Sequence, residues 1–122
     1  GDIIVTGFHT ASGVLKRTLW KIAIGTGALI WTASDFGDSA GSHGAFETID
    51  FTSGGDFALI CGLKGKPNAG EMYFRSYGNA GEGQAVVMKM PVSELSSSTA
   101  PTSSSATWVY TFSLQSSSAK AA

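Results

Sequence analysis

The chain has 122 residues, of which 43% are hydrophobic and 14% are charged, and its formal net charge is −1. This apolar content is enough for a core and argues against wholesale disorder. The small, balanced charge lacks the electrostatic signature of a protein that binds nucleic acid or an anionic membrane. No apolar run approaches the roughly 20 residues of a transmembrane helix, so we expect no membrane insertion.

Seven short segments alternate between apolar and polar residues or are rich in β-branched and aromatic residues, and clusters of Gly, Ser, Asn and Asp separate them. This pattern predicts β-strands joined by turns. In chain order the predicted strands are Ile3–Phe8, Leu19–Ile24, Ala28–Ala33, Phe46–Thr52, Phe57–Leu63, Ala85–Met90 and Thr107–Leu114. The single cysteine, Cys61, lies in the fifth of these runs, where we expect a small buried side chain without a disulfide partner.

The connections between these strands carry three further signals. Gly25-Thr26-Gly27 predicts a hairpin turn between the second and third strands. The segment 91–95 predicts one short helical turn, with Ser93 as its cap. The Ser-rich stretch 96–105 is typical of a flexible loop, or of an O-glycosylated stretch in a secreted protein.

The chain contains an internal repeat. Gly1-Asp2 and the apolar run that reaches Gly7 recur as Gly55-Asp56 and a run that reaches Gly62, with one extra residue before the glycine. Leu19-Trp20-Lys21-Ile22 then recurs as Val87-Met88-Lys89-Met90, and Ala28-Leu29-Ile30-Trp31-Thr32 recurs as Ala106-Thr107-Trp108-Val109-Tyr110. The copies begin about 54 residues apart, a period within the range of β-propeller blades.

Because four antiparallel strands make one propeller blade, the repeat predicts an all-β fold of about two blades in an incomplete propeller. We expect residues 1–44 to form a partial first blade of three strands with its connecting loop. Residues 45–114 would form a second blade of four strands, with the Ser-rich loop inside it, and residues 115–122 would begin a following repeat or form a tail. The chain has no initiator Met and opens on Gly1-Asp2, which is consistent with a processed product or an excised piece of a longer protein.

The run from Leu19-Trp20-Lys21-Ile22 through Gly25-Thr26-Gly27-Ala28 to Ile30-Trp31 resembles the repeat of quinoprotein-alcohol-dehydrogenase-like β-propellers. The resemblance implies that Gly27 belongs to a Thr-Gly turn and that Trp31 packs between neighbouring blades, with Trp108 in the same role in the second copy. Dehydrogenases of that family hold pyrroloquinoline quinone and calcium with residues from many blades. Two blades could not enclose the quinone, so we expect neither cofactor unless the chain is part of a larger enzyme.

Two loops offer weaker candidate sites. Asp35 and Asp38 in the loop 34–44 could offer oxygen ligands to calcium, although their spacing does not match an EF-hand and an inter-blade connection is the simpler interpretation. Tyr73, Arg75 and Tyr77 could form an exposed edge that binds a sugar or a partner, or could simply pack within their loop. No zinc-ligand spacing and no Gly-x-Ser-x-Gly nucleophile elbow occur, so we assign no catalytic residue.

These observations leave three functional hypotheses. The first is a non-catalytic structural or interaction segment of a secreted or cell-surface protein that assembles with further blades or with copies of itself. The second is a fragment of a quinone-cofactor dehydrogenase, and the third is a carbohydrate-binding β module that uses the segment 73–77.

Overall fold

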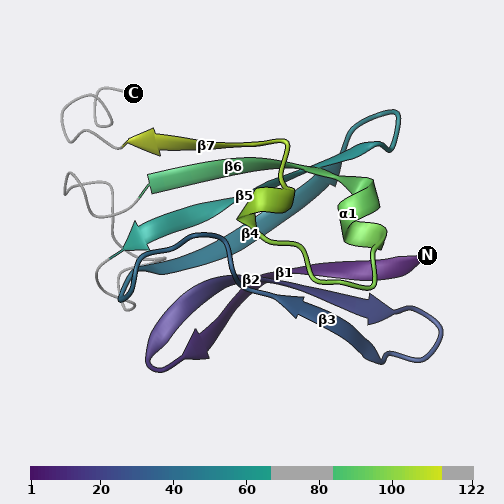
Figure 1. The fold of residues 1–122 in the computed structure, drawn as a ribbon, viewed down its shortest axis with the longest axis horizontal. Coiled ribbons are helices and arrows are strands. Elements are labelled where there is room, and N and C mark those ends of the chain that lie inside the picture. Colours follow the sequence, from purple (N-terminus) through teal and green to yellow (C-terminus); the bar gives the residue numbers. More distant parts are fainter. Residues whose placement is uncertain (67–83, 114–122) are drawn as a thin grey trace.

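The computed structural model describes residues 1–66 and 84–113, which form two antiparallel β-sheets and one short α-helix (Figure 1). Each of the seven predicted strands overlaps one observed strand. The elements are β1 (Asp2–Ala11), β2 (Val14–Ala23), β3 (Leu29–Ala33), β4 (His43–Phe51), β5 (Phe57–Lys66), β6 (Gln84–Pro91), α1 (Val92–Ser96), the 3-10 turn η2 (Ser103–Ser105) and β7 (Trp108–Ser113).

The first sheet has the order β1-β2-β3, and each strand pairs with the next along the chain. Ser12 and Gly13 join β1 to β2 with φ angles of 52° and 79°, values that suit a tight turn with left-handed backbone at both central positions. The predicted turn between β2 and β3 is confirmed. The N–H of Gly27, at a φ of 74°, donates to the Ala23 carbonyl over 2.8 Å.

The second sheet has the order β4-β5-β6-β7. The pairing of β4 with β5 shifts register twice, between His43 and Ala45 and again between Phe46 and Thr48. Gly62 makes this irregular pairing possible, since a Cβ there would collide with the Ala45 carbonyl oxygen and lie 2.8 Å from the Phe46 Cα. The glycine therefore allows β4 to bend closely over β5.

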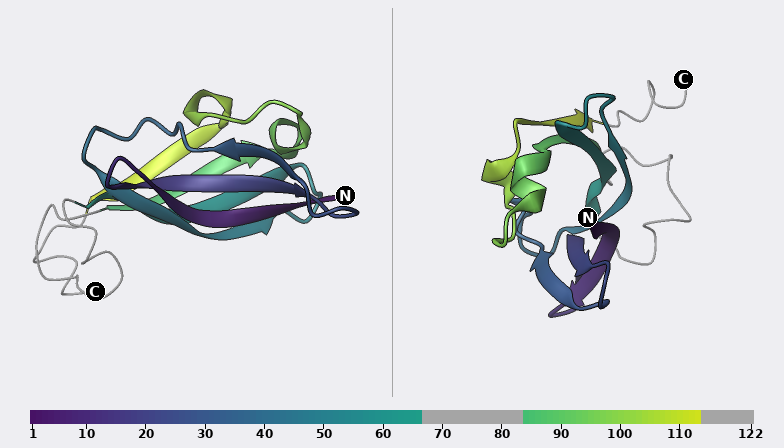
Figure 2. Two further views of the ribbon diagram at one scale, coloured as in Figure 1. Left: turned by 90° about the horizontal axis from the view of Figure 1, so that it is seen from below. Right: turned by 90° about the vertical axis from the view of Figure 1, so that its right-hand side faces the viewer.

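The two sheets share one hydrophobic core. Strand β4 lies against β1 and β2, so the three-stranded sheet runs along one side of the curved four-stranded sheet (Figure 2). Both sheets and their connections contribute to one cluster of buried side chains: Leu19, Trp31, Ala33, Phe36, Phe46, Ala58, Ile60, Met88, Met90 and Leu95. The chain thus forms two β-layers that bury each other's apolar side chains.

The connection from β6 to β7 is structured and covers part of this core. The expected helical turn is present, but it begins after Pro91 and no side chain caps it, so the prediction of Ser93 as the cap is wrong. The Ser-rich stretch is not a featureless flexible loop. Pro101 in it is buried, and the Thr102 N–H donates to the Ser105 hydroxyl oxygen over 3.0 Å, within a reciprocal capping box around η2. The sequence favoured a loop because Ser-rich composition reveals hydroxyls but not their partners.

Candidate functional site

The last strand of the four-stranded sheet exposes three aromatic side chains on one face. Trp108, Tyr110 and Phe112 alternate along β7 and are 44%, 59% and 47% exposed. Alternate residues of a strand point to the same side of its sheet. These three side chains point away from the core. Tyr110 pairs with Val87 of β6, which is half-buried, whereas Val86 and Met88 on either side of Val87 are buried and face the core.

The strand register extends this apolar surface across the sheet. Lys89, Val87 and Ala85 of β6 stand opposite the three β7 aromatic residues in order, and Leu59, Cys61 and Leu63 of β5 stand opposite the same β6 residues. We call the surface formed by Leu59, Val87, Lys89, Trp108, Tyr110 and Phe112 the Trp108 face. A shallow groove of about 460 Å³ lies along it and is lined by Val87 and the three aromatic residues. Cys61 is half-buried here, so the prediction of a buried core cysteine is wrong.

The one charged side chain of the Trp108 face is partnered by an aromatic ring. The Lys89 ammonium lies 4.1 Å from the centre of the Phe57 ring, a cation–π contact that lets an amine sit on an apolar surface. The Tyr110 and Phe112 rings pack beside each other with their centres 4.8 Å apart. The face is therefore apolar, with aromatic and cation–π contacts.

The three-stranded sheet also has an apolar outer face. Ile3 and Val5 of β1 are exposed, and their partners on β2 are the half-buried Ile22 and Trp20. We call these four residues the Trp20 face. The Trp20 ring covers Gly7, where a Cβ would come within 3.2 Å of the ring, so the glycine makes room for the indole. Each sheet thus carries apolar side chains on its outer face as well as on its core face, which is typical of sheets that are covered on two sides.

Between the sheets, a buried ion pair fixes the connection from β3 to β4. Arg17 is 1% exposed, and its Nε and Nη2 donate to the Asp38 carboxylate, each over 3.0 Å. Nη2 also donates to the Phe36 carbonyl over 2.9 Å, and the guanidinium lies 5.1 Å from the centre of the Phe46 ring. A buried guanidinium that is paired with a carboxylate and also bonds a backbone carbonyl is a structural tie.

This arrangement bears on the calcium candidates. The Asp38 carboxylate is taken by Arg17, while the Asp35 side chain is exposed and its backbone carbonyl accepts the Ser103 N–H over 3.1 Å. Within residues 1–66 and 84–113, no group of three or more His, Cys, Asp or Glu residues could hold a metal ion. The loop 34–42 links β3 of the first sheet to β4 of the second.

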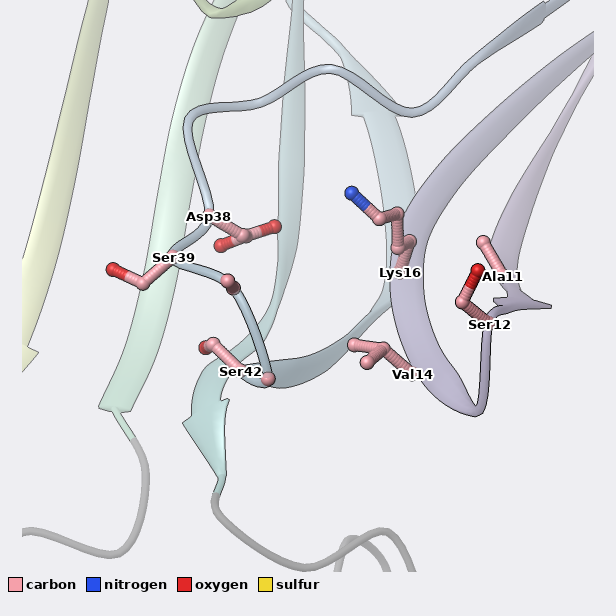
Figure 3. A pocket seen from close by; sticks show the side chains of 9 residues that line it. Ala11, Ser12, Val14, Lys16, Asp38, Ser39 and Ser42 are labelled. Carbon is pink, nitrogen blue, oxygen red and sulfur yellow. The ribbon is translucent and has the colours of Figure 1, made fainter.

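A second hollow of about 270 Å³ lies between the β1–β2 turn and the loop 38–42 (Figure 3). Lys16 extends its ammonium toward the side of the hollow where Asp38 lies, and Ser39 and Ser42 supply hydroxyls. These groups could bond a small polar molecule, but they do not pair a nucleophile with a general base.

Both histidines are engaged in bonds that hold strands. His43 Nδ1 accepts the Leu15 N–H over 3.0 Å and so ties β4 to β2 across the two sheets. His9 Nδ1 lies 2.8 Å from the Thr18 hydroxyl on the neighbouring strand. Their geometry serves packing between elements.

The residues singled out in the sequence lie in different environments. Trp31 is buried between the sheets, and its Nε1 donates to the Ser97 carbonyl over 3.1 Å. Trp108 lies on an exposed edge strand. Tyr73, Arg75 and Tyr77 lie outside the described residues, as does the segment 115–122. Sequence reasoning missed Arg17, Tyr110 and Phe112; the apolar-aromatic alternation of β7 was the signal that could have identified the last two.

In the described part of the chain, no helix is long and apolar enough to cross a membrane. Comparisons with protein-family models, with curated proteins and with solved structures found no match to this chain.

Proposed function

We propose that this chain is a non-catalytic structural or interaction segment of a secreted or cell-surface protein built from propeller-like β-repeats. Its outer sheet faces pack against further repeats or against copies of the chain. The observation that carries the proposal is the Trp108 face, where three large aromatic side chains, each more than two-fifths exposed, line one apolar groove. Contiguous apolar surface of this kind is typical of interaction sites.

The strand registers support the repeat. Gly7 pairs with Thr18, and Trp20 pairs with Val5 and Thr32. In the second sheet Gly62 pairs with Val86, and Met88 pairs with Ile60 and Val109. Matching Gly7 to Gly62 and Trp20 to Met88 therefore preserves these cross-strand pairs.

This matching refines the sequence alignment by one residue in two of the three strands. Lys21 remains equivalent to Lys89, but Trp31 becomes equivalent to Trp108, and Asp2 becomes equivalent to Phe57. The extra residue before Gly62 accounts for the shift in the first strand of the repeat.

The matching also shows which way the equivalent faces of the two sheets point. Leu19, Lys21 and Trp31 face the shared core, whereas their equivalents Val87, Lys89 and Trp108 face outward. Equivalent faces thus point the same way along the stack, as in repeats that follow one another head to tail. This direction favours propeller-like blades over two sheets that meet through the same face.

The dehydrogenase and carbohydrate-binding hypotheses have less support from the described residues. The dehydrogenase hypothesis depends on family resemblance and on further blades. The carbohydrate hypothesis depends on Tyr73 and Tyr77, which lie outside the described residues. No contact within residues 1–66 and 84–113 favours either of them over the packing role.

An apolar dye that fluoresces on binding tests the proposed docking face. We expect the folded chain to bind the dye, and the double variant Tyr110→Ser with Phe112→Ser to lose most of that signal while keeping its circular dichroism spectrum. Ile24→Ser removes a residue that is 66% exposed in the turn after β2 and serves as the control, with an unchanged signal. At a protein concentration where the wild-type chain is monomeric, the absence of dye binding, or equal signals from all three proteins, would refute the proposal.

A further inference from the structure

One lysine and one tryptophan of the first sheet bond the connection that follows β6. Lys21 and Trp31 stand opposite each other on β2 and β3 and are nearly fully buried. The Lys21 ammonium and the Trp31 indole N–H both donate to the Ser97 carbonyl, over 3.2 Å and 3.1 Å. Lys21 also lies 3.6 Å from the Asp2 carboxylate. The pair thus joins the first sheet to the connection that follows β6.

The second repeat carries the same pair in the same register. Lys89 and Trp108 stand opposite each other on β6 and β7, and Phe57, the equivalent of Asp2, lies under the Lys89 ammonium. This pair is only partly covered by the described residues: Trp108 is 44% exposed, Lys89 is half-buried, and the Trp108 indole N–H has no partner within residues 1–66 and 84–113. The surface that is buried by the second repeat in one copy is open in the other.

The chain also carries the complement of this open surface. Beside Phe46 of β4, the second sheet contributes to the shared core four residues of β5 and β6, namely Ala58, Ile60, Met88 and Met90. The register matches them to Ile3, Val5, Trp20 and Ile22, which form the Trp20 face. All eight are apolar. The strand residues on both sides of the shared core are therefore repeated on the outside of the molecule, whereas β4 and Ser97 have no equivalent in the first sheet.

We infer that a second copy of this chain binds head to tail, with its Trp20 face against the Trp108 face of the first. The inference rests on the proposed function and adds the occupant and its orientation. Because the two surfaces differ, the contact is heterologous, and each added copy presents a new Trp108 face. Such a contact produces chains of copies or a closed ring, whereas a contact between two Trp108 faces would stop at a dimer.

Sedimentation velocity over a range of protein concentrations tests the inference. We expect wild-type protein to form species larger than a dimer as its concentration rises. Tyr110→Asp, on the Trp108 face, and Val5→Asp, on the Trp20 face, should each leave a folded monomer. Thr10→Asp changes an exposed β1 residue outside both faces and should associate as wild type does.

Mixing Tyr110→Asp with Val5→Asp tests the orientation of the contact more directly. Each retains the face that the other lacks, so an equal mixture should form a dimer of one copy of each and no larger species. If either variant does not fold, Phe112→Asp and Ile3→Asp replace it on the same faces. Association of Val5→Asp that equals wild type would contradict the head-to-tail orientation. A wild-type chain that stays monomeric would overturn the inference, while dye binding still decides whether the Trp108 face is a docking surface.

Discussion

At the scale of single residues, the Arg17–Asp38 pair is a buried polar contact that holds the β3–β4 connection to β2. The two side chains are 2% and 8% exposed, and the guanidinium bonds both carboxylate oxygens and a backbone carbonyl. Asp38→Ala leaves a buried positive charge without its partner, which typically costs about 3–5 kcal/mol of unfolding free energy. We expect a loss of this size in urea unfolding.

The loop supplies its own control for that measurement. Asp35 lies three residues away with an exposed side chain, so Asp35→Ala should change the unfolding free energy by less than about 0.5 kcal/mol. Adding Arg17→Met to Asp38→Ala removes the unpaired charge and should recover part of the lost stability. Equal effects of Asp35→Ala and Asp38→Ala would show that the ion pair does not hold the connection.

At the scale of elements, the β6–β7 connection is held to the first sheet by hydrogen bonds to the Ser97 carbonyl. Comparing variants of Trp31, which makes one of these bonds, and of Trp108, which does not, distinguishes the effect of the bond from the effect of losing a tryptophan. Trp31→Phe keeps a ring in the core but loses the bond to Ser97, so we expect a loss of about 1–2 kcal/mol in urea unfolding. Trp108→Phe changes an exposed residue and should leave the stability of the monomer nearly unchanged at low protein concentration. Similar losses from both variants would contradict the different roles assigned to them.

The strands themselves were predictable because alternation and β-branched content are local properties of the sequence. The helical turn at 92–96 was placed correctly within a residue, but its cap was not, since a cap depends on backbone geometry that composition does not reveal. The irregular β4–β5 pairing at Gly62 could not be predicted either. A glycine in the sequence indicates that the backbone has room for a close approach, but not which strand approaches it. Arg17 was overlooked because its partner lies 21 residues away.

At the scale of the whole molecule, the sequence indicated a repeat but left open which face of each sheet is buried. A shift of one residue in register reverses the faces of a strand. The letter-by-letter alignment matched Trp31 to Val109, whereas cross-strand pairing matches it to Trp108. Only pairing across strands could support the proposal that the open face of the second sheet is equivalent to the buried face of the first, and the proposed docking surface follows from that equivalence.

The shared core further implies that the two sheets unfold together. Leu19 of the first sheet and Met88 of the second are each at most 1% exposed and belong to one buried cluster. Truncating either to Ala should cost about 2–5 kcal/mol. Because neither sheet can bury its apolar side chains alone, each variant should lower a single transition, with the same urea midpoint by far-ultraviolet circular dichroism and by tryptophan fluorescence. If Leu19→Ala instead separated the two midpoints, the sheets would be independent units, and the stacking of one repeat on the next would contribute little to the stability of either.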